Sequence, residues 1–176
     1  MHSVTVTAKG ARRWAAGHPW IYRSDLLSDP HSGAGAVRVM DQRGKPLGVA
    51  LWSPRSEISL RQLDHDPDAR IDGDWWRRAL ARAIARRSSL TGTNAFRLVH
   101  GEGDLIPSLI VDGYDRWLVL QLMSAGLEQF RSEIVRALIE LVRPEGILAR
   151  NDVPLRRKEG LDTNVELLHG TVPDEV

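Results

Sequence analysis

The chain of 176 residues contains no cysteine, which excludes disulfide bonds, thiolate zinc sites and a cysteine nucleophile. It has no apolar run near the roughly 18 residues that a membrane-spanning helix needs, and its N-terminus lacks the apolar core of a signal peptide. Net charge is nearly absent as well, because 24 Lys and Arg oppose 23 Asp and Glu. These absences predict a cytoplasmic protein with no membrane partner.

What the sequence does contain is an uneven distribution of charge. Residues 1–61 carry 9 basic and 4 acidic side chains, whereas residues 62–74 carry 1 basic and 5 acidic side chains. Residues 75–90 hold 5 arginines and no acid, and residues 91–176 carry 9 basic and 14 acidic side chains. The basic surface therefore lies in the first half, where we expect an anionic partner to dock.

The segment from Ala11 to Asp25 concentrates arginines, a histidine and three aromatic rings. Arginines interleaved with aromatics suit a surface that meets phosphates and unpaired bases. The alternative is a barrel strand whose rings point inward. Because Trp20 and Tyr22 alternate, we expect both rings to face the core and the arginines to face a ligand.

The order of predicted elements indicates an α+β protein. The first part is a series of short extended runs split by turns, at Val4–Thr7, Trp20–Tyr22, Val37–Met40, Leu47–Trp52 and Ile58–Leu63. Such spacing is typical of a small β barrel. An acidic, proline-containing segment then interrupts the strands, which predicts one domain over residues 1–72 and a second over residues 73–176.

The second domain is predicted to be mixed α/β with two main helices. Asp72 or Asp74 can cap the first helix, whose apolar face includes Trp76 and Leu80. Arg78, Arg82 and Arg86 share another face, which is either solvated or in contact with RNA. Further strands are expected at 96–100, 109–112, 117–123 and 147–149, with the second helix at 127–142.

Two segments could carry chemistry, and each has a simpler interpretation. Residues 101–104 resemble part of a glycine-rich phosphate loop, but Pro107 interrupts the helix that such a loop requires, so a turn is favoured. His100, Glu102 and Asp104 could form a metal or acid/base set, or ordinary loop charges. The charged residues 150–152 and 156–160 could grip phosphate or be solvated. From the residues alone, the chain is a binding protein.

The order of the motifs carries a resemblance to a known family. The first group is Lys9-Gly10 with Arg12-Arg13, His18-Pro19-Trp20-Ile21-Tyr22, and Gly48 to Pro54 with Ser56 and Ile58. It resembles the N-terminal PUA domain of the large-subunit ribosomal RNA methyltransferase I family. The second group is similar to that family's central domain: Arg97 to Asp104, Pro107, Leu109 to Asp112, Tyr114 and Lys158 to Leu161. The chain departs from the family at Ser108 and Gly113.

The resemblance implies an N-terminal PUA-like barrel followed by a mixed α/β domain. The family continues into a Rossmann-like domain that binds S-adenosylmethionine and carries the catalytic cysteine, and this chain ends about where that domain would begin. Methylation of cytosine at carbon 5 requires a thiolate that this chain lacks. We therefore expect no catalytic residue, metal site or cofactor site in this chain, and no activity from it alone.

The implied role is RNA binding and substrate positioning for an S-adenosylmethionine-dependent cytosine-5 methyltransferase. The expected partner is structured RNA, specifically large-subunit ribosomal RNA, and the chain could also pair with itself. The expected RNA contacts are Lys9, Arg12, Arg13, His18, Arg23 and Arg55. The alternative is a stand-alone adaptor that binds a protein, and salt dependence separates the two because phosphate contacts release counterions.

Overall fold

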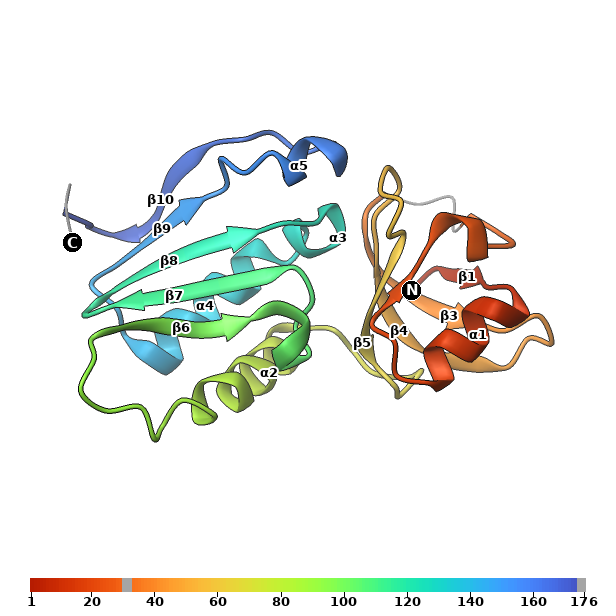
Figure 1. The fold of residues 1–176 in the computed structure, drawn as a ribbon, viewed down its shortest axis with the longest axis horizontal. Coiled ribbons are helices and arrows are strands. Elements are labelled where there is room, and N and C mark those ends of the chain that lie inside the picture. The colour runs from red at the N-terminus through yellow and green to blue at the C-terminus, as the bar shows by residue number, and fades with distance from the viewer. Residues whose placement is uncertain (30–32, 174–176) are drawn as a thin grey trace.

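The structure is a computed structural model that describes residues 1–29 and 33–173 (Figure 1). Residues 30–32 of the first predicted domain and residues 174–176 of the second lie outside the described residues. Two sheets of five strands each follow one another along the chain. The predicted α+β class, with a small sheet of strands first and a mixed α/β part second, is confirmed.

The first sheet curls into a half-barrel. Its strands are β1 (Ser3–Thr5), β2 (Trp20–Ile21), β3 (Gly35–Met40), β4 (Pro46–Trp52) and β5 (Leu60–Asp64), in the order β1-β3-β4-β5-β2. β1 runs parallel to β3, and the other pairs are antiparallel. Alternating residues of these strands fill a core around Val39, Trp52 and Trp14.

The helix α1 (Ala8–Ala15) occupies part of the segment for which we weighed a barrel strand. That alternative is wrong for these residues. Thr7 caps the helix, since its hydroxyl accepts a hydrogen bond from the Gly10 amide. Gly10 lets the helix approach the sheet closely, because a Cβ there would lie 3.0 Å from the Cβ of Val6. Trp14, on the same side, is buried in the half-barrel.

The second sheet comprises β6 (Ala95–His100), β7 (Leu109–Tyr114), β8 (Trp117–Leu122), β9 (Gly146–Arg150) and β10 (Val165–Gly170), in the order β10-β9-β8-β7-β6. Only the neighbouring strands β8 and β9 are parallel. The helices α2 (Gly73–Ala85) and α4 (Arg131–Val142) pack on one face of this sheet (Figure 1). Two short helices, α3 (Ala125–Glu128) and α5 (Leu155–Lys158), lie near the first sheet.

The predicted helices are confirmed in position but not in every detail. Asp72 caps α2 by accepting a hydrogen bond from the Trp75 amide at 2.9 Å, and Trp76 and Leu80 are buried as expected. The helix predicted at 127–142 is two helices, because the chain leaves the helical conformation at Phe130. The Phe130 ring packs against Trp76, with ring centroids 5.3 Å apart.

The two sheets share part of their apolar interior. Leu51 of β4 and Leu63 of β5 belong to the core of the second sheet, whereas Ala50 and Trp52 face the core of the half-barrel. β4 is therefore buried on both faces. The half-barrel is consequently held against the second sheet by apolar packing as well as by the polar contacts described below.

Candidate nucleic-acid interface

The helix α1 presents three of the six predicted RNA contacts, Lys9, Arg12 and Arg13. Its Gly10 and Trp14 side faces the half-barrel, which leaves Lys9 and Arg12 exposed on the outside. Arg12 forms no ion pair with any described residue. Its guanidinium is thus available for a phosphate without first breaking an internal contact.

Asp25 organises the other two cations of this helix. Its side chain is only 3% exposed, and its carboxylate lies 3.4 Å from the Lys9 ammonium and 3.4 Å from Arg13 Nε. The Arg13 guanidinium also lies over the ring of Tyr22, 4.9 Å from its centroid. Three cations against one carboxylate leave α1 with an excess of positive charge.

The remaining predicted contacts serve different purposes. The His18 ring is oriented by Trp20, since Nδ1 lies 3.0 Å from the Trp20 carbonyl oxygen and 3.2 Å from its amide nitrogen. Arg23 donates hydrogen bonds to the carbonyl oxygens of Pro54 and Ser56, the latter at 3.0 Å. Arg55 is exposed on the turn beside Gly160. The six residues therefore fall into a group on and after α1 and a group around residues 54–56.

The expectation that Trp20 and Tyr22 face the core is wrong. Ile21 between them is the buried residue, at 1% exposure, while both rings are half-buried. The Trp20 indole instead donates a hydrogen bond at 2.8 Å to Glu102, which precedes the second strand of the other sheet. The ring thus bridges the two parts of the molecule.

A buried polar joint connects the half-barrel to the second sheet. The guanidinium of Arg61 in β5 lies 2.7 Å from the Glu159 carboxylate, and both side chains are at most 5% exposed. The same carboxylate accepts a hydrogen bond from the Ala125 amide at 3.2 Å, at the start of α3. Gly126 of α3 approaches the backbone of β4 so closely that a Cβ at this position would lie 2.8 Å from the Trp52 carbonyl oxygen.

This environment keeps Glu159 ionised. Burial by itself would raise the pKa of the Glu159 carboxyl, but the charge of Arg61 and hydrogen bonds from Ser56 and Ser53 hold that pKa below its ordinary value. The joint is therefore charged on both sides at neutral pH. Sequence reasoning missed it, because nothing local distinguishes Glu159 from an ordinary solvated glutamate.

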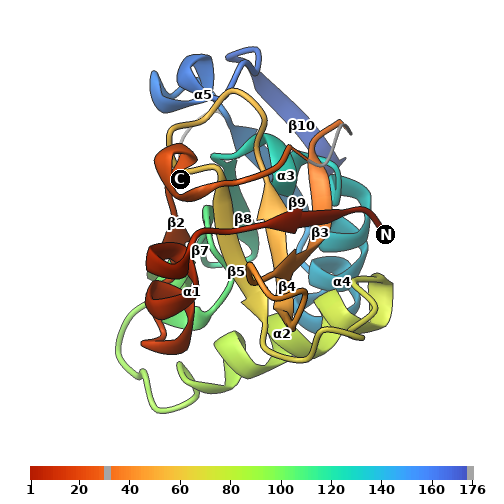
Figure 2. The same ribbon diagram turned by 90° about the vertical axis from the view of Figure 1, so that its right-hand side faces the viewer.

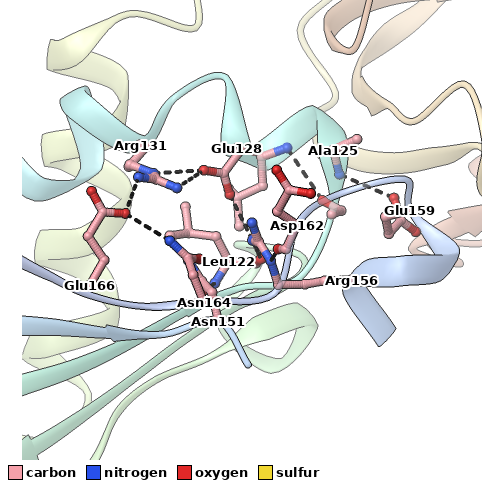
Figure 3. Close-up of polar contacts among 12 residues, drawn as sticks. Leu122, Ala125, Glu128, Arg131, Asn151, Arg156, Glu159, Asp162, Asn164 and Glu166 are labelled. Carbon is pink, nitrogen blue, oxygen red and sulfur yellow. Dashed lines mark hydrogen bonds and ion pairs between the residues drawn. The ribbon is translucent and has the colours of Figure 1, made fainter. Parts of the chain in front are cut away.

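A second network continues from the joint, as Figure 3 shows. Arg156 is 2% exposed and donates to Glu128 at 2.8 Å, and Arg131 bridges Glu128 to Glu166 at 2.8 Å. Asn151 is fully buried and accepts a hydrogen bond from the Leu122 amide at 2.9 Å. The interpretation of residues 150–152 and 156–160 as solvated is thus wrong for Asn151, Arg156 and Glu159, which are buried and hydrogen-bonded within the fold.

Two positions among the described residues could offer a helix N-terminus to a cofactor phosphate, and at neither is such a terminus free. In the second sheet, the parallel strands β8 and β9 are connected through α3 and α4, and the Ala125 amide at the start of α3 already donates a hydrogen bond to Glu159. Residues 101–104 form the predicted turn, a 3₁₀ segment that no α-helix follows directly. A bound cofactor phosphate or carboxylate would need such a helix N-terminus to be free.

The possible metal set formed by His100, Glu102 and Asp104 does not come together. Asp104 is buried and pairs with Arg87 at 2.6 Å, while Glu102 accepts from Trp20. Between residues 1 and 29 and between 33 and 173, no group of three potential ligands is placed to hold a metal ion. Nor does any helix in these ranges have the length and apolar character to cross a bilayer.

Comparison with known proteins finds similarity over most of this chain. Residues 4–65 match the family described as a PUA-like domain. The chain is 40% identical over 165 residues to ribosomal RNA large subunit methyltransferase I of Tolumonas auensis, and 37% identical over 164 residues to that of Alteromonas mediterranea. These matches cover 90% of this chain but only 42% and 41% of the relatives.

The fold recurs in longer solved proteins. A putative SAM-dependent methyltransferase from Streptococcus mutans matches with a TM-score of 0.82 at 16% identity, over 99% of this chain and 45% of that chain. A putative methyltransferase solved in complex with SAH matches with a TM-score of 0.81 at 16% identity, over 99% of this chain and 44% of that chain. At 16% identity, the likeness shows that the fold of both sheets is shared.

Proposed function

Because this chain is similar over nine tenths of its length to the N-terminal part of ribosomal RNA large subunit methyltransferase I, we propose that it is an RNA-binding and substrate-positioning unit. Residues 1–72 dock structured RNA, and residues 73–176 hold that RNA-binding domain in a fixed orientation. Methyl transfer from S-adenosylmethionine belongs to a further domain of the kind that completes the longer relatives.

The observation that carries this proposal is the excess of cations on α1. Lys9 and Arg13 share the buried carboxylate of Asp25, and Arg12 has no ion-pair partner among the described residues, so positive charge remains to meet phosphates. The ring of Tyr22 under Arg13 adds an aromatic surface beside these cations. His18 and Arg55 extend the proposed contacts, whereas Arg23 acts chiefly by holding the turn that carries Arg55.

Large-subunit ribosomal RNA is the proposed partner. Because the relatives are bacterial proteins named for that RNA, the cytoplasm is the proposed compartment. Pairing of two copies is a separate part of the proposal, for which light scattering of the purified chain gives the mass directly. A mass of one chain at micromolar concentration would remove this part without affecting RNA binding.

The test is a fluorescence-anisotropy titration of the purified chain against a structured ribosomal RNA fragment and a DNA duplex of equal length. Measured at several salt concentrations, RNA affinity should fall with a log–log slope of about 0.7–0.9 per phosphate contact. Tighter binding to RNA with a steep slope is expected. Equal weak binding to both would overturn the proposal and favour the protein-binding adaptor.

A further inference from the structure

We propose that the RNA footprint extends across the cleft between the two sheets onto Arg78 and Arg82 of α2, and that the cleft takes one unpaired nucleotide of the RNA. This inference rests on the proposed function, because it names the RNA feature that the same surface selects. It goes beyond the proposed function because it also assigns RNA contacts to the second part of the molecule.

The cleft has the size and walls for a nucleotide base. Its volume is about 450 Å³, and its lining comes from both sheets: Gly17, Pro19, Gln62, Leu63, Asp64, His65, Arg82, Glu102, Leu105 and Pro107. Ligand sites of this size are typically apolar with a few polar groups that fix orientation. Here Leu105 and Pro107 supply the apolar side, while Gln62 and His65 supply hydrogen-bonding groups.

Leu105 marks the mouth of the cleft. It has a left-handed backbone, with φ 60° and ψ 28°, and its side chain is 65% exposed. Leucine rarely adopts this conformation, and exposing it to water adds a further cost. The fold thus holds an apolar side chain where it lowers stability, and contact with a base would give that side chain a partner.

Positive charge flanks the cleft on both sides. Gly17 follows α1 directly, and Arg82 reaches the cleft from α2. Both helices lie in the lower half of the molecule in Figures 1 and 2. Arg78 and Arg82 are exposed and form no ion pair with any described residue. A backbone that passes from one helix to the other therefore meets free guanidinium groups at each end.

The carboxylates inside the cleft select a base over a phosphate. Asp64 accepts a hydrogen bond from the Trp75 indole, and Glu102 accepts one from the Trp20 indole, both at 2.8 Å. Carboxylate oxygens at these positions disfavour a phosphate but can accept hydrogen bonds from base amino groups. Phosphates consequently belong at the arginines on the rim and the base belongs inside.

The first experiment compares two double variants with equal charge change. Arg78→Gln/Arg82→Gln removes the α2 cations, and Arg136→Gln/Arg157→Gln removes two exposed arginines elsewhere that also lack ion pairs with described residues. Each is titrated with an RNA hairpin that carries a single-nucleotide bulge. The α2 variant should bind about tenfold or more weakly near 0.1 M salt and lose about 1.4–1.8 from the salt slope, as expected for two lost contacts. The control should stay close to the unmodified chain.

The second experiment tests the cleft itself with Leu105→Gly. Glycine accepts the left-handed backbone, so this variant should fold at least as well as the unmodified chain. The unmodified chain should prefer the bulged hairpin over a fully paired one, and 2-aminopurine at the bulge should change fluorescence on binding. Leu105→Gly should reduce both the preference and the fluorescence change.

The outcomes separate this inference from the function on which it rests. If Arg12→Ala/Arg13→Ala weakens RNA binding while the α2 variant matches its control, RNA docking stands and the extended footprint is overturned. Equal affinity of the unmodified chain for bulged and paired hairpins overturns the nucleotide site. If the unmodified chain fails to prefer RNA over DNA, both proposals fail together.

Discussion

Arg61 and Glu159 are separated by 98 residues in the sequence, yet their charged groups lie 2.7 Å apart in the buried joint between the two sheets. Such a pair couples the folding of the first sheet, through β5, to that of the last part of the chain. Its contribution depends on both partners, because either charge left alone in the interior would be costly.

Glu159→Gln should therefore destabilise the protein by about 3–5 kcal/mol, since it leaves the Arg61 guanidinium buried without a counter-charge. Urea denaturation followed by circular dichroism gives this free energy. The control is Asp68→Asn, which breaks the exposed pair with Arg38 and should cost at most about 1 kcal/mol. Equal effects from both variants would contradict a special role for the joint.

The stability of the protein should fall in acid. Burial opposes ionisation of Asp104 and Glu159, but Arg87 and Arg61 respectively outweigh it, so the pKa of each carboxyl lies below its ordinary value of 3.8 or 4.5. A lowered folded pKa contributes stability above the unfolded pKa, and this contribution is lost as pH falls through the folded pKa.

Denaturation midpoints between pH 7 and pH 3 measure this loss. The unmodified chain should lose stability below about pH 4.5, and Asp104→Asn should show a flatter profile because it has one such carboxyl fewer. A profile of Asp104→Asn that parallels the unmodified chain would assign the acid sensitivity to other groups.

Gly126→Ala should destabilise the protein by about 1–3 kcal/mol, because overpacking forces neighbouring atoms apart. The added Cβ would lie 2.8 Å from the Trp52 carbonyl oxygen and 2.9 Å from the Leu51 Cβ. Gly73→Ala is the matched control, since a Cβ there meets nothing within 4 Å. Thermal unfolding of both variants checks the difference, and a destabilised Gly73→Ala with an unaffected Gly126→Ala would refute the packing argument.

Arg12→Ala should affect RNA binding and leave stability unchanged, whereas Arg23→Ala should affect stability. Arg12 has no ion-pair partner among the described residues, so its loss should reduce the RNA salt slope by about 0.7–0.9 and leave the unfolding free energy nearly unchanged. Arg23 donates to two carbonyl oxygens, so its loss should lower stability by about 1–3 kcal/mol. The opposite assignment of effects would reverse the roles given to these residues.

The sequence predicted the elements whose signals are local. The Asp72 cap and helical spacing of Trp76 and Leu80 identified α2, alternation identified β3, and an apolar run that follows a turn identified β4. α1 was missed because Gly10 and its short length resemble a loop, and its cap and buried Trp14 become decisive only against the sheet. β10 was missed because its exposed edge position gives little apolar alternation.

For the candidate site, composition located the basic residues but not their partners. The cluster around Arg12 and Arg13 was evident from charge alone, whereas the burial of Asp25 beneath them depends on the packing of α1. The use of Trp20 as a bridge to Glu102 depends on a contact over 82 residues. Pairings at such separations follow from tertiary structure and leave no periodic signal in the sequence.

The buried Arg61–Glu159 pair also restricts motion of one sheet relative to the other. With Arg61 and Glu159 locked together and Gly126 pressed against the backbone of Trp52, the two sheets cannot swing apart without exposing a desolvated ion pair. The span between α1 and α2 is therefore a fixed property of the fold. Under the proposed function, we therefore expect the protein to bind best an RNA whose own geometry already matches that span.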